Sequence, residues 1–197
     1  ATGVQGHAAY PHRARNPVHA LVRLASAILM DEPLAQLDVR ARADAMRQIA
    51  TVQAGDGVTL LVATNDQAVA AGLASRLVVL DEGRVRQSGP FQDLYDRPVD
   101  TFVAQFVGSP PMNLLPGIVW DDGDMSAISV ARTELRSYDR RLRPYAGDRV
   151  LVGIRPEHLR LAAPGDDEAF TATVRHRGFT GPTVHLHLEV AGQHEVV

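Results

Sequence analysis

The spacing of apolar residues changes once along this chain, and the change limits the folds open to it. From Ser26 to Val107, short apolar runs alternate with longer amphipathic stretches, which is typical of strands alternating with helices. From Gly117 onward the helical spacing is absent, and runs of alternating or β-branched residues indicate a small barrel or sandwich. The segment GSPPMNLLPG, residues 108–117, separates the two patterns with three prolines and two glycines. We therefore predict an α/β domain followed by an all-β domain.

The boundary is predicted at 109/110, so that residues 1–109 form the first domain and residues 110–197 the second. The last apolar run stops at EVV without a closing turn, and we expect the β domain to be incomplete. Trp120, the only tryptophan, is expected in the core of this domain.

Within the first domain, SAILMD is predicted to be a buried strand that ends in two acidic residues. Residues 38–53 carry apolar side chains at helical spacing, with Asp38 as the N-cap. VTLLVAT predicts a second buried strand, and a helix is expected from about Asp66 to Ser75. RLVVLDEGRVRQSG predicts two strands joined by a tight turn at Glu82 and Gly83.

Composition excludes several kinds of chemistry. The 197 residues include no cysteine, which rules out thiolate catalysis, disulfides and cysteine-ligated zinc. All 20 basic residues are arginine, so the phosphate-binding lysine of a Walker A loop and Schiff-base chemistry are absent from this chain. A net charge of -3 argues against general binding of nucleic acid. No apolar run approaches the ~20 residues of a spanning helix, and none is predicted.

The strongest local signal is ILMDEP, followed after a short gap by LD at Leu37 and Asp38. A hydrophobic strand ending in Asp31 and Glu32 is what a Walker B site requires: the first carboxylate holds Mg²⁺, and the second polarises a water beyond the γ-phosphate. Taken alone, the motif also fits an ordinary strand followed by a polar turn, which occurs in many sheets.

The surrounding residues resemble the ATP-binding subunits of ABC transporters, in the carbohydrate-importer branch of the maltose, trehalose and glycerol-phosphate systems. Three segments carry the resemblance in family order: ALVRLASAILMDEPLAQLD, the stretch that begins LLVATNDQ, and GIRPEHL at residues 153–159. The resemblance implies a partial P-loop NTPase domain, its Walker B half, followed by an OB-like regulatory domain of the TOBE type. It also implies that ATP and Mg²⁺ are the cofactors.

The same resemblance implies roles for four residues. Asp31 would coordinate Mg²⁺, Glu32 would be the catalytic carboxylate, and Asp38 would be the D-loop residue at a dimer seam. Asn65, in TNDQ, stands where the family carries a switch histidine. Asparagine can hydrogen-bond a γ-phosphate or a water, but it has no basic nitrogen to take a proton.

The chain also departs from the family. The Walker A loop and Q-loop precede the signature motif in these proteins, and no such segments occur here. The LSGGQ signature is expected at His7–Pro11, where the chain reads HAAYP. We therefore expect this chain alone to be inactive as an ATPase, and we expect it to be a C-terminal portion of the subunit.

The resemblance implies partners as well: transmembrane permease subunits, and a second ATPase subunit in a homodimer on the inner face of the cell membrane, in the cytoplasm. The alternative is a non-catalytic subunit, degenerate or truncated, that acts as a binding or dimerisation module. His185, His187 and His194 form an incomplete set of metal ligands, so an ordinary polar strand face is favoured over a metal site there.

Overall fold

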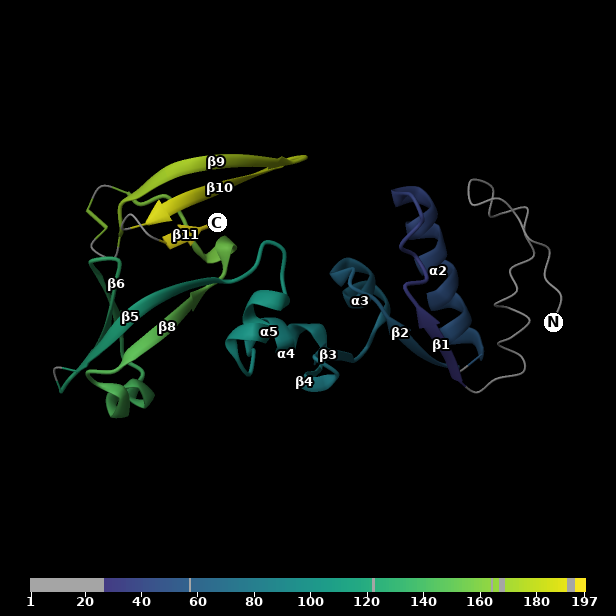
Figure 1. Cartoon of the computed structure of the whole chain (residues 1–197), viewed down its shortest axis with the longest axis horizontal. Coiled ribbons are helices and arrows are strands. Elements are labelled where there is room, and N and C mark those ends of the chain that lie inside the picture. The colour runs from purple at the N-terminus through teal and green to yellow at the C-terminus, as the bar shows by residue number, and fades with distance from the viewer. Residues whose placement is uncertain (1–26, 57, 122, 164, 167–168, 191–193) are drawn as a thin grey trace. The chain divides into compact units, whose positions relative to one another are not determined.

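The computed structural model describes residues 27–197 apart from 57, 122, 164, 167–168 and 191–193. The chain divides into two compact units between Leu94 and Tyr95, each described below by itself (Figure 1). The helices of the first unit are α2 (Val39–Asp56), α3 (Gln67–Leu73) and α4 (Phe91–Asp96), the last of which crosses the division; its strands are β1 (Ala27–Asp31), β2 (Thr59–Ala63), β3 (Leu77–Asp81) and β4 (Arg84–Gly89).

The second unit contains α5 (Thr101–Phe106) and two 3₁₀ helices, η2 (Arg140–Tyr145) and η3 (Pro156–His158). Its strands are β5 (Asn113–Asp121), β6 (Ser126–Val130), β7 (Thr133–Ser137), β8 (Arg149–Ile154), β9 (Ala172–Thr180), β10 (Thr183–Val190) and β11 (His194–Val196). The predicted order, α/β followed by all-β, is confirmed.

Strands β1 and β2 form a parallel pair joined by α2, a βαβ arrangement. Their side chains alternate between two faces, and the partly buried Ile28 and Leu60 pack against Val52 and Val58 on the α2 side. On the opposite face Leu29 and Leu61 are 73% and 63% exposed. The sheet therefore has one covered face and one open apolar face among the described residues.

The caps of the two helices around this sheet follow from single aspartates. The Oδ1 atom of Asp38 accepts a hydrogen bond from the backbone N–H of Ala41 at 2.9 Å, which confirms the predicted N-cap of α2. Asp66 caps α3 in the same way, accepting from the N–H groups of Ala68 and Val69. Further along, β3 and β4 form an antiparallel hairpin whose turn is at Glu82 and Gly83, both at positive φ, as predicted.

The β domain consists of two sheets with one shared core. Its four-stranded sheet has the order β7-β6-β5-β8, and its three-stranded sheet the order β11-β10-β9. Leu115 and Val130 from the first sheet are buried with Val190 and Val196 from the second. The Asn113 side-chain amide reinforces this packing, because it both donates to and accepts from the backbone of Val197.

Three expectations about the β domain differ from the structure. Strand β7 lies in a segment, TELRS, whose polar composition gave no strand signal. HLRLA, residues 158–162, has an alternating apolar pattern that predicts a strand, but it begins at the last residue of η3 and continues as irregular chain. Trp120 is not in the core: Val119 is fully buried, so strand alternation places Trp120 on the outer face, 58% exposed.

Arg155 explains why the second unit begins before the proline-rich segment. This side chain is only 3% exposed, and its guanidinium donates to the carbonyls of Ala104, Val107 and Tyr95 at 3.0, 2.5 and 2.7 Å. It also lies 3.9 Å from the Tyr95 ring centroid. Gly108, at φ +112°, leaves room for it, because a Cβ there would lie 2.8 Å from Nη1. Helix α5 is therefore held on the β domain. The domain boundary at 109/110 stays a prediction.

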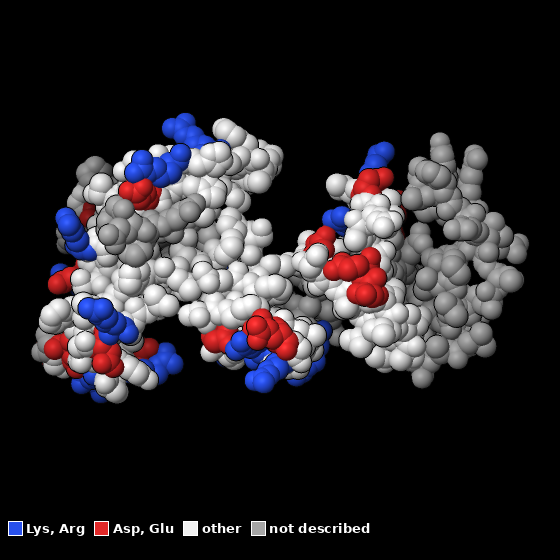
Figure 2. All heavy atoms as spheres, viewed as in Figure 1, with Lys and Arg blue, Asp and Glu red and all other residues white. Residues whose placement is uncertain are grey.

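Charged side chains of both signs lie beside one another on the face of the molecule shown in Figure 2. Several arginines there and elsewhere form pairs with acids, including Arg86 with Asp81, Arg160 with Asp166, and Arg175 with Glu189. Such exposed pairs contribute little to stability. No helix in the described part of the chain is long and apolar enough to cross a membrane.

Candidate active-site half

The carboxyl ends of β1 and β2 place the sequence-predicted residues close together. The two strands are in parallel register from Ala27 opposite Thr59 to Asp31 opposite Ala63. The pairing extends one residue further, since the Glu32 N–H donates to the Ala63 carbonyl at 2.9 Å. Glu32 and the loop after β2 thus meet at one sheet edge, where open α/β sheets bind ligands.

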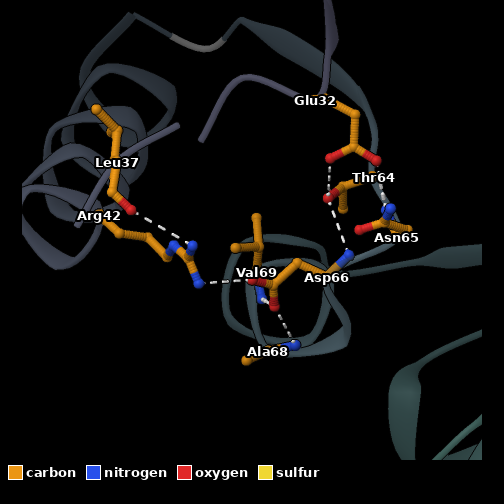
Figure 3. Close-up of polar contacts among 8 residues, drawn as sticks. All are labelled: Glu32, Leu37, Arg42, Thr64, Asn65, Asp66, Ala68 and Val69. Atoms are coloured by element: carbon orange, nitrogen blue, oxygen red, sulfur yellow. Dashed lines mark hydrogen bonds and ion pairs between the residues drawn. The ribbon is translucent and has the colours of Figure 1, made fainter. Parts of the chain in front are cut away.

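Glu32 is the centre of the polar contacts at this edge (Figure 3). One carboxylate oxygen, Oε1, accepts from the backbone N–H of Asn65 at 2.8 Å, and Oε2 accepts from the Thr64 hydroxyl at 2.9 Å. The backbone of Glu32 is left-handed, with φ +40°. A non-glycine residue in this region is strained, and such strain persists where the surrounding contacts fix it. The Glu32 carboxylate is therefore held at a defined place between the two strands.

A second set of contacts links this edge to the start of α2. Arg42 Nη1 bonds Asp66 Oδ2 at 2.8 Å, and Nη2 reaches the Leu37 carbonyl at 3.4 Å (Figure 3). The Asp66 N–H in turn donates to the Thr64 hydroxyl oxygen at 3.1 Å. Arg42 thereby connects the loop after β2 to Leu37, just before α2. The side chain of Asp38 takes no part in these contacts, because it caps α2.

Asp31 differs from Glu32 in its surroundings. It occupies an exposed position on the face of β1 that Leu29 shares, away from α2. Asp38, also exposed, uses its carboxylate to cap α2. Asn65 is exposed and contacts Glu32 through its backbone N–H. The structure therefore brings Glu32 and Asn65 together. Asp31 lies next to Glu32 in the chain but on the exposed face of β1, and Asp38 lies at the start of α2.

Sequence reasoning did not single out Thr64 or Arg42. A threonine one residue after an apolar strand, directly before the switch position, was the available signal for Thr64. Arg42 had no local signal, because its partner Asp66 lies 24 residues away along the chain. A contact between residues so far apart in the chain depends on how β1 and β2 pair, and the periodicity of apolar residues does not predict that pairing.

The donor set suits Mg²⁺ in part. Mg²⁺ prefers oxygen ligands, keeps several waters and takes one or two carboxylates together with substrate phosphates. The exposed Asp31 carboxylate at the sheet edge fits that requirement. Among the described residues, however, no three His, Asp or Glu side chains are grouped closely enough to hold a metal ion by themselves. The site thus fits a metal shared with a nucleotide rather than a metal held by protein alone.

Comparison with known proteins finds two family matches in the second half of the chain. The family description "MalK OB fold domain" matches residues 108–159, and the description "TOBE domain" matches residues 152–197. A similar protein is the sn-glycerol-3-phosphate import ATP-binding protein UgpC 1 of Rhizobium johnstonii, 40% identical over 154 residues, which are 78% of this chain and 41% of that protein.

Two further relatives agree. UgpC of Cereibacter sphaeroides is 38% identical over 178 residues, covering 90% of this chain and 48% of that protein. The trehalose/maltose import ATP-binding protein MalK of Thermococcus litoralis is 35% identical over 181 residues, covering 88% of this chain and 48% of that protein. The chain spans about half the length of the curated relatives that it matches.

Together with the fold, these matches identify the chain as a C-terminal portion of an ABC-transporter ATP-binding subunit. The relatives are named for the import of sn-glycerol 3-phosphate and of trehalose and maltose, and the OB region of this chain matches the family description of MalK.

A different description, "Peptidase dimerisation domain", matches residues 1–65. The relatives that cover 88–90% of the chain overlap most of that range. The segment His7–Pro11, where the ABC signature was expected, lies inside this match and outside the described residues. The described residues between 27 and 65 contain β1, α2, β2 and the first two residues after β2, so both comparisons concern the elements around Glu32.

Proposed function

We propose that this chain supplies the acidic and switch half of an ATP-hydrolysing site that powers the import of a sugar or related solute. The observation that carries the proposal is the Glu32 carboxylate, held between the ends of β1 and β2 by the Thr64 hydroxyl and the Asn65 N–H. A carboxylate fixed at that edge can accept the proton of a water and orient it for attack on phosphorus.

The other residues take supporting parts. Asp31 would hold Mg²⁺, which neutralises phosphate charge when bound. Asn65 would hydrogen-bond the attacking water or a phosphate oxygen through its side-chain amide. Asp38 would act at the seam with a second copy. The described residues contain no glycine-rich phosphate-binding loop. We assign phosphate binding to the part of the subunit that corresponds to the unmatched half of the relatives.

Partners and location follow from the same relationship. The relatives are named as import ATP-binding proteins, and import across a membrane needs a permease. We therefore propose transmembrane permease subunits and a second ATPase subunit as partners, with the protein located peripherally on the cytoplasmic face of the membrane.

The test joins residues 27–197 to the unmatched N-terminal part of the Rhizobium relative and measures Mg²⁺-dependent phosphate release. Glu32→Gln keeps the size and hydrogen-bonding shape but removes the base, so turnover should fall by roughly 10²–10⁴-fold. Glu82→Gln, in the exposed β3–β4 turn, is the matched control and should retain turnover. Full activity of the Glu32→Gln chimera would overturn the proposal.

A second candidate is the non-catalytic dimerisation module, favoured by the match of residues 1–65 to a peptidase dimerisation domain. Leu29 and Leu61, exposed on the open face of the β1–β2 sheet, would supply apolar area for a second copy. Under this candidate the chain dimerises at micromolar concentration, Leu29→Asp makes it monomeric, and the chimera gains no ATPase activity.

A further inference from the structure

The hairpin of β9 and β10 places histidines in an arrangement that the sequence did not reveal. His187 pairs directly opposite His176 in the antiparallel register. Their ring centroids lie 5.5 Å apart, with an angle of 55° between the ring planes. Directly opposed residues of two paired strands project from the same face of the sheet. Two imidazoles therefore lie side by side on one face, positioned by the pairing of the strands.

The neighbouring positions leave space on that face. Gly178 pairs opposite His185, one step closer to the hairpin turn. A Cβ built at Gly178 would lie 4.0 Å from His187 Nε2 and 4.0 Å from His185 Cβ. The His187 ring thus reaches over a position that has no side chain, and His185, two residues before His187, shares its face. Three histidines occupy a face whose middle is open.

The charge near this face does not oppose a cation. Arg175, beside His176, bonds Glu189 at 2.5 Å, so that its charge is paired. Arg177 is opposite Leu186 in the register and alternates to the other face of the hairpin. Imidazole nitrogens select borderline first-row transition-metal ions rather than Mg²⁺ or Ca²⁺, which prefer oxygen ligands.

We propose that this face of the β9–β10 hairpin binds a divalent transition-metal ion such as Zn²⁺, with His176 and His187 as its protein ligands. Water would fill the remaining coordination positions, because no third His, Asp or Glu, His185 included, is grouped with this pair among the described residues. His176, which strand pairing brings to His187, lies outside the set of His185, His187 and His194 that the sequence pattern suggests. The site belongs to the β domain and does not depend on the proposed ATPase function.

The experiment titrates the full chain with Zn²⁺ and with Ni²⁺ by calorimetry and follows the imidazole signals by NMR. We expect one site, with the signals of His176 and His187 shifting first. His176→Asn and His187→Asn should each weaken binding by at least about tenfold, since even the residues that only orient metal ligands are worth that much. Circular dichroism checks that each variant is folded.

Two controls identify the location. His158→Asn, at an exposed histidine in η3, should leave the affinity unchanged, and so should a variant that replaces His7, His12 and His19 together. Gly178→Asp places a carboxylate beside His187 Nε2 and should tighten binding by roughly tenfold, or about 1.4 kcal/mol. Unaltered binding in both hairpin variants, loss of binding in the variant of His7, His12 and His19, or no response to Gly178→Asp would each overturn the proposal.

Discussion

Replacing Arg155 by alanine tests the attachment of α5 to the β domain. The guanidinium is buried and donates to three backbone carbonyls, on Tyr95, Ala104 and Val107. A hydrogen bond to a charged group contributes about 1.5–3 kcal/mol, so three would total about 4.5–9 kcal/mol if they were additive. They share one side chain, however, and water entering the vacated space would solvate some of the carbonyls. We expect a loss of about 3–5 kcal/mol, as for other broken buried charge interactions.

The measurement should report on the attachment itself, because a chain with two compact units need not unfold in one step. Hydrogen exchange of the α5 amides gives the free energy of local opening. In Arg155→Ala this opening energy should fall to near zero, while protection in α2 stays unchanged. Arg160→Ala removes an exposed partner of Asp166 and serves as the control, with no change expected in α5.

The reasoning would be refuted by an Arg155→Ala protein in which α5 loses less than about 1 kcal/mol of protection. That result would mean that packing of Val103 and Ala104, both buried, holds the helix without the arginine. Arg155→Lys separates charge from geometry, because a single ammonium cannot reach three carbonyls in a planar fork. It should behave almost like alanine.

Three further predictions can be tested directly. Burial raises the pKa of Glu157, but the hydrogen bond from the Tyr95 hydroxyl and the nearby positive charges outweigh it and hold the pKa below its usual 4.5. A lowered carboxyl pKa adds stability that is lost on acidification. Tyr95→Phe should therefore make stability fall less steeply with decreasing pH below about pH 4.5. Gly117→Ala should lower stability by about 1–3 kcal/mol in urea unfolding, since its Cβ would lie 2.8 Å from Ile128. The chain alone should release no phosphate from ATP above background, and Asn65→His should not change that, whereas in the chimera the same change should raise turnover.

How much of this could be predicted from the sequence depended on whether the signal was local. The strand at β1, the α2 cap at Asp38 and the turn at Glu82 were predicted, because each follows from periodicity or from one side chain bonding its own neighbours. The expected burial of that strand was wrong, since Leu29 on one of its faces is exposed. The error at Trp120 has the opposite cause. A tryptophan is a strong core signal, but its face is fixed by the register of the whole strand, and Val119 takes the inner side.

The candidate site was predicted in its residues but not in its contacts. Glu32 and Asn65 were named from motifs, and their roles stay predictions. The hydrogen bonds that position Glu32 come from Thr64 and Asn65, which follow β2. They form only because β1 and β2 pair in register. The pairing of His176 with His187 likewise depends on strand register, which runs without interruption from Thr183 opposite Thr180 to His187 opposite His176.

The attachment of α5 to the β domain bears on how recombinant pieces of this protein should be cut. The recognised OB region begins at residue 108, and a fragment started there would look complete by sequence. It would lack every carbonyl that Arg155 bonds, and it would expose to water the apolar surface against which Val103 and Ala104 of α5 are buried. Such a piece should aggregate on expression. A fragment that begins near Pro90 keeps all three acceptors and the Tyr95 ring, and should be the shorter piece that can be purified.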